Sequence, residues 1–278
     1  MNNNQTWRLI PLLKASGKVQ MTIDRWLLEQ HLLRNHPPTL RFYIWSSPTI
    51  SLGYHQKKYP LHWENLTWKG QKLDLVRRPT GGRAVLHQGD LTYAVVTSNV
   101  PGNRIEAYKK ICTFLIQGWQ KLGLDLNYGT AGRGYIHNPN CFGTATSADL
   151  VLPDRTKFIG SAQLRKGNFI LQHGSIRLKP EPELFTQVFD ADSFTSVKLP
   201  DTLETDVLEA ANNRLENLEL EKFNSQEFNS QEFNFKEINI EKIVDTLVDS
   251  AIDCFGIKFE INPLSELEWH NISKLGNW

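Results

Sequence analysis

The chain of 278 residues has no long apolar run and almost no net charge. A helix that crosses a bilayer needs roughly 20 consecutive apolar residues, and no stretch approaches that length. The 31 Lys and Arg residues nearly balance the 30 Asp and Glu residues, so the charge favours neither nucleic acid nor an anionic membrane as a partner. The opening residues, MNNNQT, lack the basic and apolar regions of a secretory signal. We therefore expect a cytoplasmic protein.

Cysteine is also scarce. Cys112, Cys141 and Cys254 lie far apart, and the sequence has no Cys-x-x-Cys pair. An odd number of cysteines in a reducing compartment argues against a disulfide framework. A structural zinc site needs paired ligands at short spacing, so we expect no metal. Each cysteine is therefore either a buried small side chain or a reactive thiol.

The composition, 40% hydrophobic and 22% charged, is typical of a globular protein with a sizeable core. Apolar periodicity predicts helices over residues 19–34 and 106–122. Runs of β-branched and aromatic residues predict strands over residues 40–45, 49–53, 73–77, 91–97, 149–152, 157–164 and 168–178. The last three are joined by short polar turns, and such a meander favours an α+β fold over a doubly wound parallel sheet.

The composition changes in the last third of the chain. Residues 206–222 and 236–254 are charged and amphipathic, which predicts two helices. Between them, near residues 223–235, the pentapeptide FNSQE occurs twice in tandem, and we interpret this segment as a low-complexity surface loop. We expect one domain over residues 1–180 and a helical accessory segment over residues 181–278.

The loop Arg77–His87, RRPTGGRAVLH, is the first stretch that indicates chemistry. Two adjacent glycines let a backbone adopt positive φ and approach a ligand closely. The three arginines supply bidentate donors for carboxylate, phosphate or carbonyl oxygens. A tight hairpin with solvated arginines explains the same residues equally well, because Gly-Gly is common turn chemistry. The loop is not a Walker loop, since Gly-x-x-x-x-Gly-Lys-[Ser/Thr] is absent.

Cys141 lies in the polar, turn-prone stretch NPNCFG, whereas Cys112 and Cys254 lie in apolar periodic runs typical of core cysteines. A loop cysteine is more exposed, and it becomes a nucleophile where a neighbouring group favours the thiolate. Without a visible base, a lone cysteine is a weak signal. The residues alone leave both interpretations of Cys141 open.

Lys157 begins the predicted strand KFIGSAQ, where a lysine is normally a solvated edge charge. If strands 149–152 and 157–164 form a hairpin, however, Lys157 could lie near Cys141. Its ammonium would then favour the thiolate and bind a developing oxyanion. For His87 and His173, a hydrogen-bonded core or surface histidine is the more ordinary interpretation than a general base.

Together these segments resemble the biotin/lipoate protein ligase family. The matching stretches are RRPTGGRAVLH at 77–87, DLTY at 90–93, KFIGSAQ at 157–163 and LQHGS at 171–175. They fall between about Trp7 and Leu178, and their combination in this order is specific. The resemblance implies the family's α+β fold, a mixed and largely antiparallel sheet with flanking helices. The catalytic core of class II aminoacyl-tRNA synthetases and biotin ligases has this architecture.

Within the family, the position of Cys141 is similar to that of the cysteine-dependent octanoyl-[acyl-carrier-protein]:protein N-octanoyltransferases, and Gln163 also suits that branch. The resemblance implies an acyltransferase of lipoate biosynthesis that needs no cofactor. It would carry octanoyl from acyl carrier protein, through a thioester on Cys141, to a lysine of an apo lipoyl-domain protein. That acceptor would be a protein such as the glycine cleavage H protein or a 2-oxoacid dehydrogenase E2 subunit.

The resemblance also implies the residues of the site. Cys141 and Lys157 would be catalytic, and the substrate would contact Arg78, Gly81, Gly82, Arg83, Ala84, Val85, His87, Gly160, Ser161 and His173. Three other activities fit the same fold. An ATP-dependent lipoate ligase would not use Cys141, an amidotransferase would take its acyl group from another lipoyl domain, and a binding module would have lost turnover.

Overall fold

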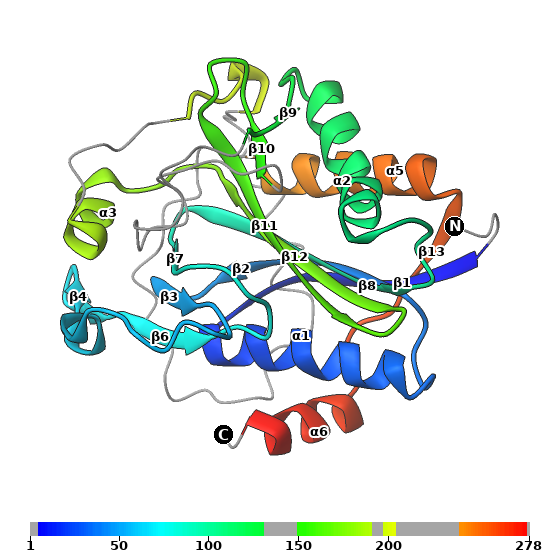
Figure 1. Ribbon diagram of the computed structural model, residues 1–278, viewed down its shortest axis with the longest axis horizontal. Coiled ribbons are helices and arrows are strands. Elements are labelled where there is room, and N and C mark those ends of the chain that lie inside the picture. The colour runs from blue at the N-terminus through cyan, green and yellow to red at the C-terminus, as the bar shows by residue number, and fades with distance from the viewer. Residues whose placement is uncertain (1–4, 131–148, 191–196, 204–238, 277–278) are drawn as a thin grey trace.

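The computed structural model describes residues 5–130, 149–190, 197–203 and 239–276. Its main sheet has the strand order β13-β1-β2-β8-β12-β11-β10-β9 (Figure 1). In chain order these strands are β1 (Gln5–Ala15), β2 (Thr39–Trp45), β8 (Asp90–Ser98), β9 (Asn127–Tyr128), β10 (Asp149–Val151), β11 (Lys157–Lys166), β12 (Phe169–Arg177) and β13 (Ile257–Ile261).

Among the described strands of this sheet, the pairs β1–β13 and β1–β2 are parallel, and the other pairs are antiparallel. The predicted α+β fold with a mixed, largely antiparallel sheet is therefore confirmed. The predicted meander of three strands is β10, β11 and β12, and its first two strands form the expected hairpin. The sequence analysis missed β13 and β1 at one side of this sheet and the short strand β9 at the opposite edge.

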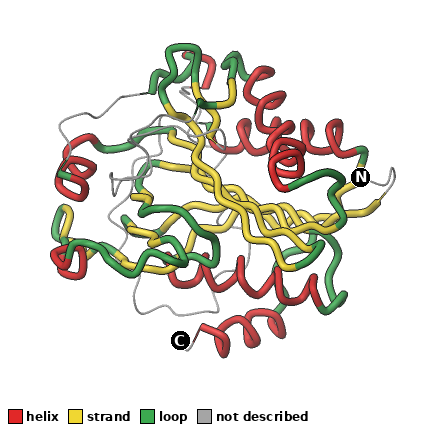
Figure 2. The backbone as a smooth tube through the Cα atoms, in the orientation of Figure 1, coloured by secondary structure: helices red, strands yellow, loops and turns green. Residues whose placement is uncertain are grey.

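Helices cover both faces of the sheet (Figure 2). The helices α2 (Arg104–Lys121) and α5 (Ile240–Phe255) lie over one face, and α1 (Gly17–Leu32) and α6 (Glu266–Gly276) lie over the other. Side chains alternate between the two cores as a strand requires: Phe42 packs on the α2 side and Tyr43 on the α1 side. The helices predicted over residues 19–34, 106–122 and 236–254 correspond to α1, α2 and α5.

The start of α2 is fixed by its own sequence. Asn103 accepts hydrogen bonds from the backbone N–H groups of Ile105 and Glu106, and the Glu106 carboxylate accepts one from the Asn103 N–H in return. This capping box satisfies N–H groups that the first turn would leave without partners. It holds the first turn of α2 at one wall of the cavity described below.

A second sheet, β6-β3-β7, packs beside the first. It consists of β3 (Thr49–Leu52), β6 (Asp74–Arg77) and β7 (Val85–His87), and it shares a hydrophobic core with η1 (Leu61–Asn65) and α3 (Pro182–Phe189). The small hairpin β4 (Thr67–Trp68) and β5 (Gln71–Lys72) and the turn η2 (Asp201–Leu203) complete the described elements. Because β6 and β7 flank β3 on opposite sides, the loop between them must cross over β3, and it is therefore not a tight hairpin.

The C-terminal elements join the main sheet. The guanidinium of Arg8 in β1 donates to both carboxylate oxygens of Glu268 in α6, at 2.6 and 2.9 Å. On the other face, α5 packs so closely on α2 that a Cβ added at Gly118 would lie 2.6 Å from Leu247. Residues 206–222 and the low-complexity segment near 223–235 lie outside the described residues, and the division of the chain at residue 180 stays a prediction. Among the described helices, none combines the length and apolar character that crossing a bilayer requires.

Candidate functional site

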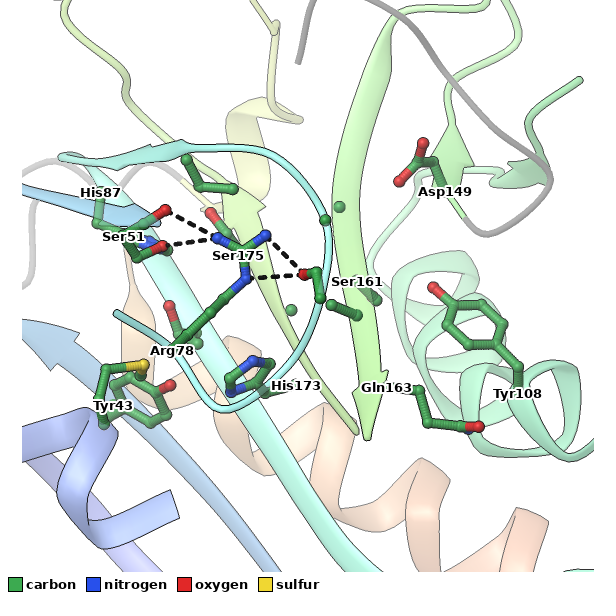
Figure 3. Close-up of a pocket in the computed structure, with 18 of the residues that line it drawn as sticks. Tyr43, Ser51, Arg78, His87, Tyr108, Asp149, Ser161, Gln163, His173 and Ser175 are labelled. Carbon is green, nitrogen blue, oxygen red and sulfur yellow. Dashed lines mark hydrogen bonds between the residues drawn. The ribbon is translucent and has the colours of Figure 1, made fainter. Parts of the chain in front are cut away.

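A cavity of about 280 Å³ lies where the two sheets meet, bounded by central strands, the first turns of α1 and α2, and the loop between β6 and β7 (Figure 3). This volume is just below that of most ligand pockets, which range from about 300 to 1,000 Å³. The sequence-predicted residues that line it are Arg78, Gly81, Gly82, Val85, His87, Gly160, Ser161 and His173. Of the other predictions, Arg83, Ala84 and Lys157 are not among the lining residues, and Cys141 lies outside the described residues.

Arg78 holds the β6–β7 loop together from inside. Its guanidinium is buried and donates to the carbonyl oxygens of Ser51, Gly81 and Arg83. Gly82 has a φ of +98°, and a Cβ there would lie 2.7 Å from the Arg78 guanidinium. Gly82 thus permits a close approach of this loop to its own arginine, whereas a Cβ at Gly81 would meet no atom within 4 Å.

At one end of the cavity, the Asp90 carboxylate accepts hydrogen bonds from the side chains around it. His87 Nδ1 lies 2.8 Å from the Asp90 carboxylate, and His87 Nε2 lies 2.8 Å from the hydroxyl of Ser51. Ser175 also donates to Asp90, at 2.6 Å. Burial lowers the pKa of His87, although the nearby Asp90 carboxylate opposes that shift. The imidazole is therefore neutral at pH 7, and Trp45 stacks on it with ring centroids 3.9 Å apart.

A second aspartate lies behind the neighbouring wall. Asp24, on α1, accepts hydrogen bonds from His173 Nδ1 at 2.7 Å and from the Tyr43 hydroxyl at 3.0 Å, and Arg41 forms an ion pair with it. The hydroxyl of Thr80 is 2.6 Å from His173 Nε2, which ties the β6–β7 loop to β12. Asp24 and Asp90 do not line the cavity, so their carboxylates stand behind the rings, the hydroxyls and Arg78, which face its interior at this end.

The opposite end holds an ion pair. Lys157 Nζ lies 2.9 Å from Asp149 Oδ1, and the two side chains are 3% and 4% exposed. Asp149 lines the cavity, and Figure 3 places it across from Tyr43 and His87, beyond Ser161. The buried guanidinium of Arg177 lies near the same strand end, donates to the Lys157 carbonyl at 3.4 Å, and has a pKa lowered to about 10 by burial.

The two described cysteines are poor nucleophiles. Cys112 is buried in the α2 core, where desolvation raises its pKa to about 12. Cys254 is half-buried on α5, and burial raises its pKa to about 11. Since only a thiolate is an effective nucleophile, neither is reactive near neutral pH.

Several lining residues escaped the sequence analysis, among them Met21, Tyr43, Trp45, Ser51, Thr92, Arg104, Tyr108 and Asp149. Most lie on elements that were predicted correctly, but only the packing of those elements brings them together. Asp149 carried a usable signal, because it stands at the start of a strand whose hairpin partner begins with Lys157. Among residues that the structure describes, no three His, Cys, Asp or Glu side chains gather in a way that could hold a metal ion.

Comparison with known proteins shows which protein family this chain is similar to. The sequence profile of the lipoyl protein ligase A/B catalytic domain matches residues 16–233. Octanoyltransferase LipM of Kyrpidia tusciae is 40% identical over 190 residues, which are 64% of this chain and 68% of that protein. Octanoyltransferase LipM of Bacillus subtilis is 38% identical over 197 residues, 66% of this chain and 70% of that protein.

Solved structures share the fold. A T. acidophilum protein with bound lipoic acid matches with a TM-score of 0.69 at 18% identity, covering 98% of this chain and 95% of that one. A bipartite lipoate protein ligase from Thermoplasma acidophilum, studied with its E2 lipoyl domain, matches with a TM-score of 0.64 at 20% identity. That match covers 99% of this chain and 93% of the other.

Proposed function

The chain belongs to the lipoyl protein ligase A/B catalytic domain family and is an octanoyltransferase, and from this premise we propose that it transfers the octanoyl group through a thioester on Cys141. The donor is octanoyl-acyl carrier protein and the acceptor is a lysine of an apo lipoyl-domain protein, such as the glycine cleavage H protein or a 2-oxoacid dehydrogenase E2 subunit. The reaction takes place in the cytoplasm and serves lipoate biosynthesis.

The transfer consists of two displacements. In the first, the Cys141 thiolate attacks the thioester carbonyl, a new C–S bond forms, and the bond to the carrier's sulfur breaks. The carrier leaves as a thiol after taking up a proton. In the second, the neutral amine of the acceptor lysine attacks, a C–N bond forms and the bond to Cys141 breaks. The proton lost by the nitrogen balances the thiolate released. Because a thioester is exchanged for an amide, no ATP is required.

The observation that carries the proposal is the ion pair at one end of the cavity. Lys157 is held by Asp149, and Asp149 follows Cys141 by eight residues. A tether of that length reaches about 28 Å when fully extended, so Cys141 can reach the cavity end that Asp149 lines. An ammonium there would favour a thiolate and stabilise negative charge on the carbonyl oxygen.

The rest of the cavity suits the acyl chain. From the Asp149 end, the wall continues through Ala162 and Tyr108, and Met21 and Trp45 line it at the other end. The Asp24 and Asp90 carboxylates at that end stand behind the lining, and the Arg78 guanidinium already donates to three carbonyl oxygens, so a hydrocarbon tail leaves no charge without partners. We place the carbonyl near Lys157 and the methyl end near Trp45.

Turnover with defined substrates tests the proposed function. The chain is mixed with octanoyl-acyl carrier protein and an apo lipoyl domain, and the domain's mass is followed with and without ATP. We expect one octanoyl group on the domain without ATP. Modification that needs ATP and free lipoate or octanoate would show a ligase instead. Transfer only from an octanoylated lipoyl domain would show an amidotransferase, and no transfer from any donor would indicate a binding module.

A further inference from the structure

Asp149 has an unusual place in the hairpin. It begins β10, it lines the cavity, and its carboxylate holds the amine of Lys157, yet the residue directly across from it on β11 is Gly160. Lys157 lies directly across from Val151 instead, because the register shifts between Leu150 and Val151. Such bulges re-aim side chains and are frequent beside active sites.

The neighbours of Asp149 favour this arrangement. Gly160 has no side chain, so the carboxylate has room beside β11. A buried ammonium is costly unless it is paired, and Asp149 supplies a counter-charge 2.9 Å from it. The lysine side chain is long and flexible, and a pair with a carboxylate fixed on a neighbouring strand removes much of that freedom.

We propose that Asp149 is a positioning residue, which holds the Lys157 ammonium at the end of the cavity where the thioester carbonyl arrives. This inference rests on the proposed function, because it gives Lys157 a carbonyl to act on. The carbonyl oxygen gains negative charge while the thiolate attacks, and a cation fixed beforehand stabilises that charge without reorganising during the reaction. Without the Asp149 carboxylate, the Lys157 side chain would lose the contact that fixes its amine at this position.

Substitution of Asp149 tests the idea against a matched control. Asp149→Asn removes the counter-charge and keeps the shape, and Asp149→Glu keeps the charge. Asp154→Asn makes the same chemical change in the exposed turn of the same hairpin, where the carboxylate only accepts from the Thr156 N–H. The measured quantities are kcat and KM for octanoyl-acyl carrier protein. We expect Asp149→Asn to lower kcat by about 100-fold with little change in KM, since misplacement of a catalytic group costs about that much.

The same series contains the results that would overturn the proposal. Asp149→Glu should recover most of the lost kcat, and Asp154→Asn should match the unmodified chain. A wild-type kcat in Asp149→Asn would overturn the proposal, as would a Glu variant no better than Asn. A loss that appears in KM alone would also contradict it, because it would make Asp149 a simple binding contact.

A double-mutant cycle separates positioning from direct catalysis. If Asp149 acts through Lys157, then Asp149→Asn should cost nothing further in a Lys157→Ala background. A second, multiplicative loss in the double variant would contradict the proposal. If Asp149→Asn alone fails to fold, the double variant can still be compared with Lys157→Ala. The double variant carries no unpaired charge from this ion pair, so it tests whether Asp149 acts through Lys157.

Failure of this inference can be told apart from failure of the proposed function. The first measurement is acylation of the unmodified chain by octanoyl-acyl carrier protein without ATP. If that fails, the proposed function is wrong and the inference falls with it. If the unmodified chain is acylated and the Asn variant keeps its kcat, only the role of Asp149 is wrong.

Discussion

The two ends of the cavity each rely on a buried aspartate but use it in opposite ways. At the hairpin end, Asp149 itself lines the cavity and forms an ion pair with Lys157. At the far end, Asp90 stands behind the wall, and the ring of His87 faces inward. One end therefore presents a carboxylate to the cavity, and the other presents rings, hydroxyls and Arg78.

The partner of each aspartate explains the difference. Lysine carries a charge that burial with a carboxylate preserves as an ion pair. Histidine loses its charge more readily, and burial lowers the pKa of His87, which favours the neutral ring. The two ends of the cavity therefore differ: an aspartate faces the interior at the Lys157 end and stands behind the wall at the His87 end.

Substitution of the proposed nucleophile, Cys141, should have the largest effect on octanoyl transfer. Cys141→Ala should lower octanoyl transfer by more than about a thousandfold, because no other thiol can carry the acyl group. The measurement is transfer to an apo lipoyl domain, with Cys254→Ala, at a half-buried position on α5, as the control. Full activity in Cys141→Ala would rule out the thioester mechanism.

Removal of the Lys157 ammonium should lower the rate of transfer somewhat less. Lys157→Ala should lower kcat by about 100- to 1,000-fold, the range for losing one donor that stabilises an oxyanion. Lys166→Ala, at the exposed far end of the same strand, provides the control and should behave like the unmodified chain. If both lysine variants react equally fast, the two ends of the cavity do not differ in the way described here.

Thiol chemistry gives a third test. Burial raises the pKa of Cys112 to about 12 and of Cys254 to about 11, so both are almost wholly protonated at pH 8. We expect iodoacetamide at pH 8 to alkylate Cys141 at least about 100 times faster than either, since the thiolate is the reactive form. Peptide mapping over time measures the three rates. Cys112 or Cys254 reacting first would contradict the assignment.

Substitution at the His87 end of the cavity should have the smallest effect, and it should change KM rather than kcat. His87→Ala removes a wall contact that substrate and transition state share, so KM should rise by about tenfold while kcat changes little. The control is His62→Ala in the exposed part of η1. A large loss of kcat would mean that His87 takes part in the chemistry and that the contrast between the ends is wrong.

The hairpin that carries Asp149 and Lys157 could be predicted from the sequence, whereas the His87 end of the cavity could not. The strands around Lys157 and His173 are bounded by short polar turns, so the hairpin and the meander followed from local residues. The ends of the cavity did not, because the contacts of Asp24 with His173 and of Asp90 with Ser175 join residues far apart in the chain. The strands β1 and β13 were also missed, since their parallel pairing joins residues about 250 apart in the chain.

The location of the acyl group tests the account most directly. The chain is incubated with octanoyl-acyl carrier protein without ATP and without an acceptor, digested at low pH, and mapped by mass spectrometry. We expect one octanoyl group on Cys141. Hydroxylamine should remove it, and it should pass to a lysine when an apo lipoyl domain is added. An adduct on another residue, or none until ATP is supplied, would contradict it.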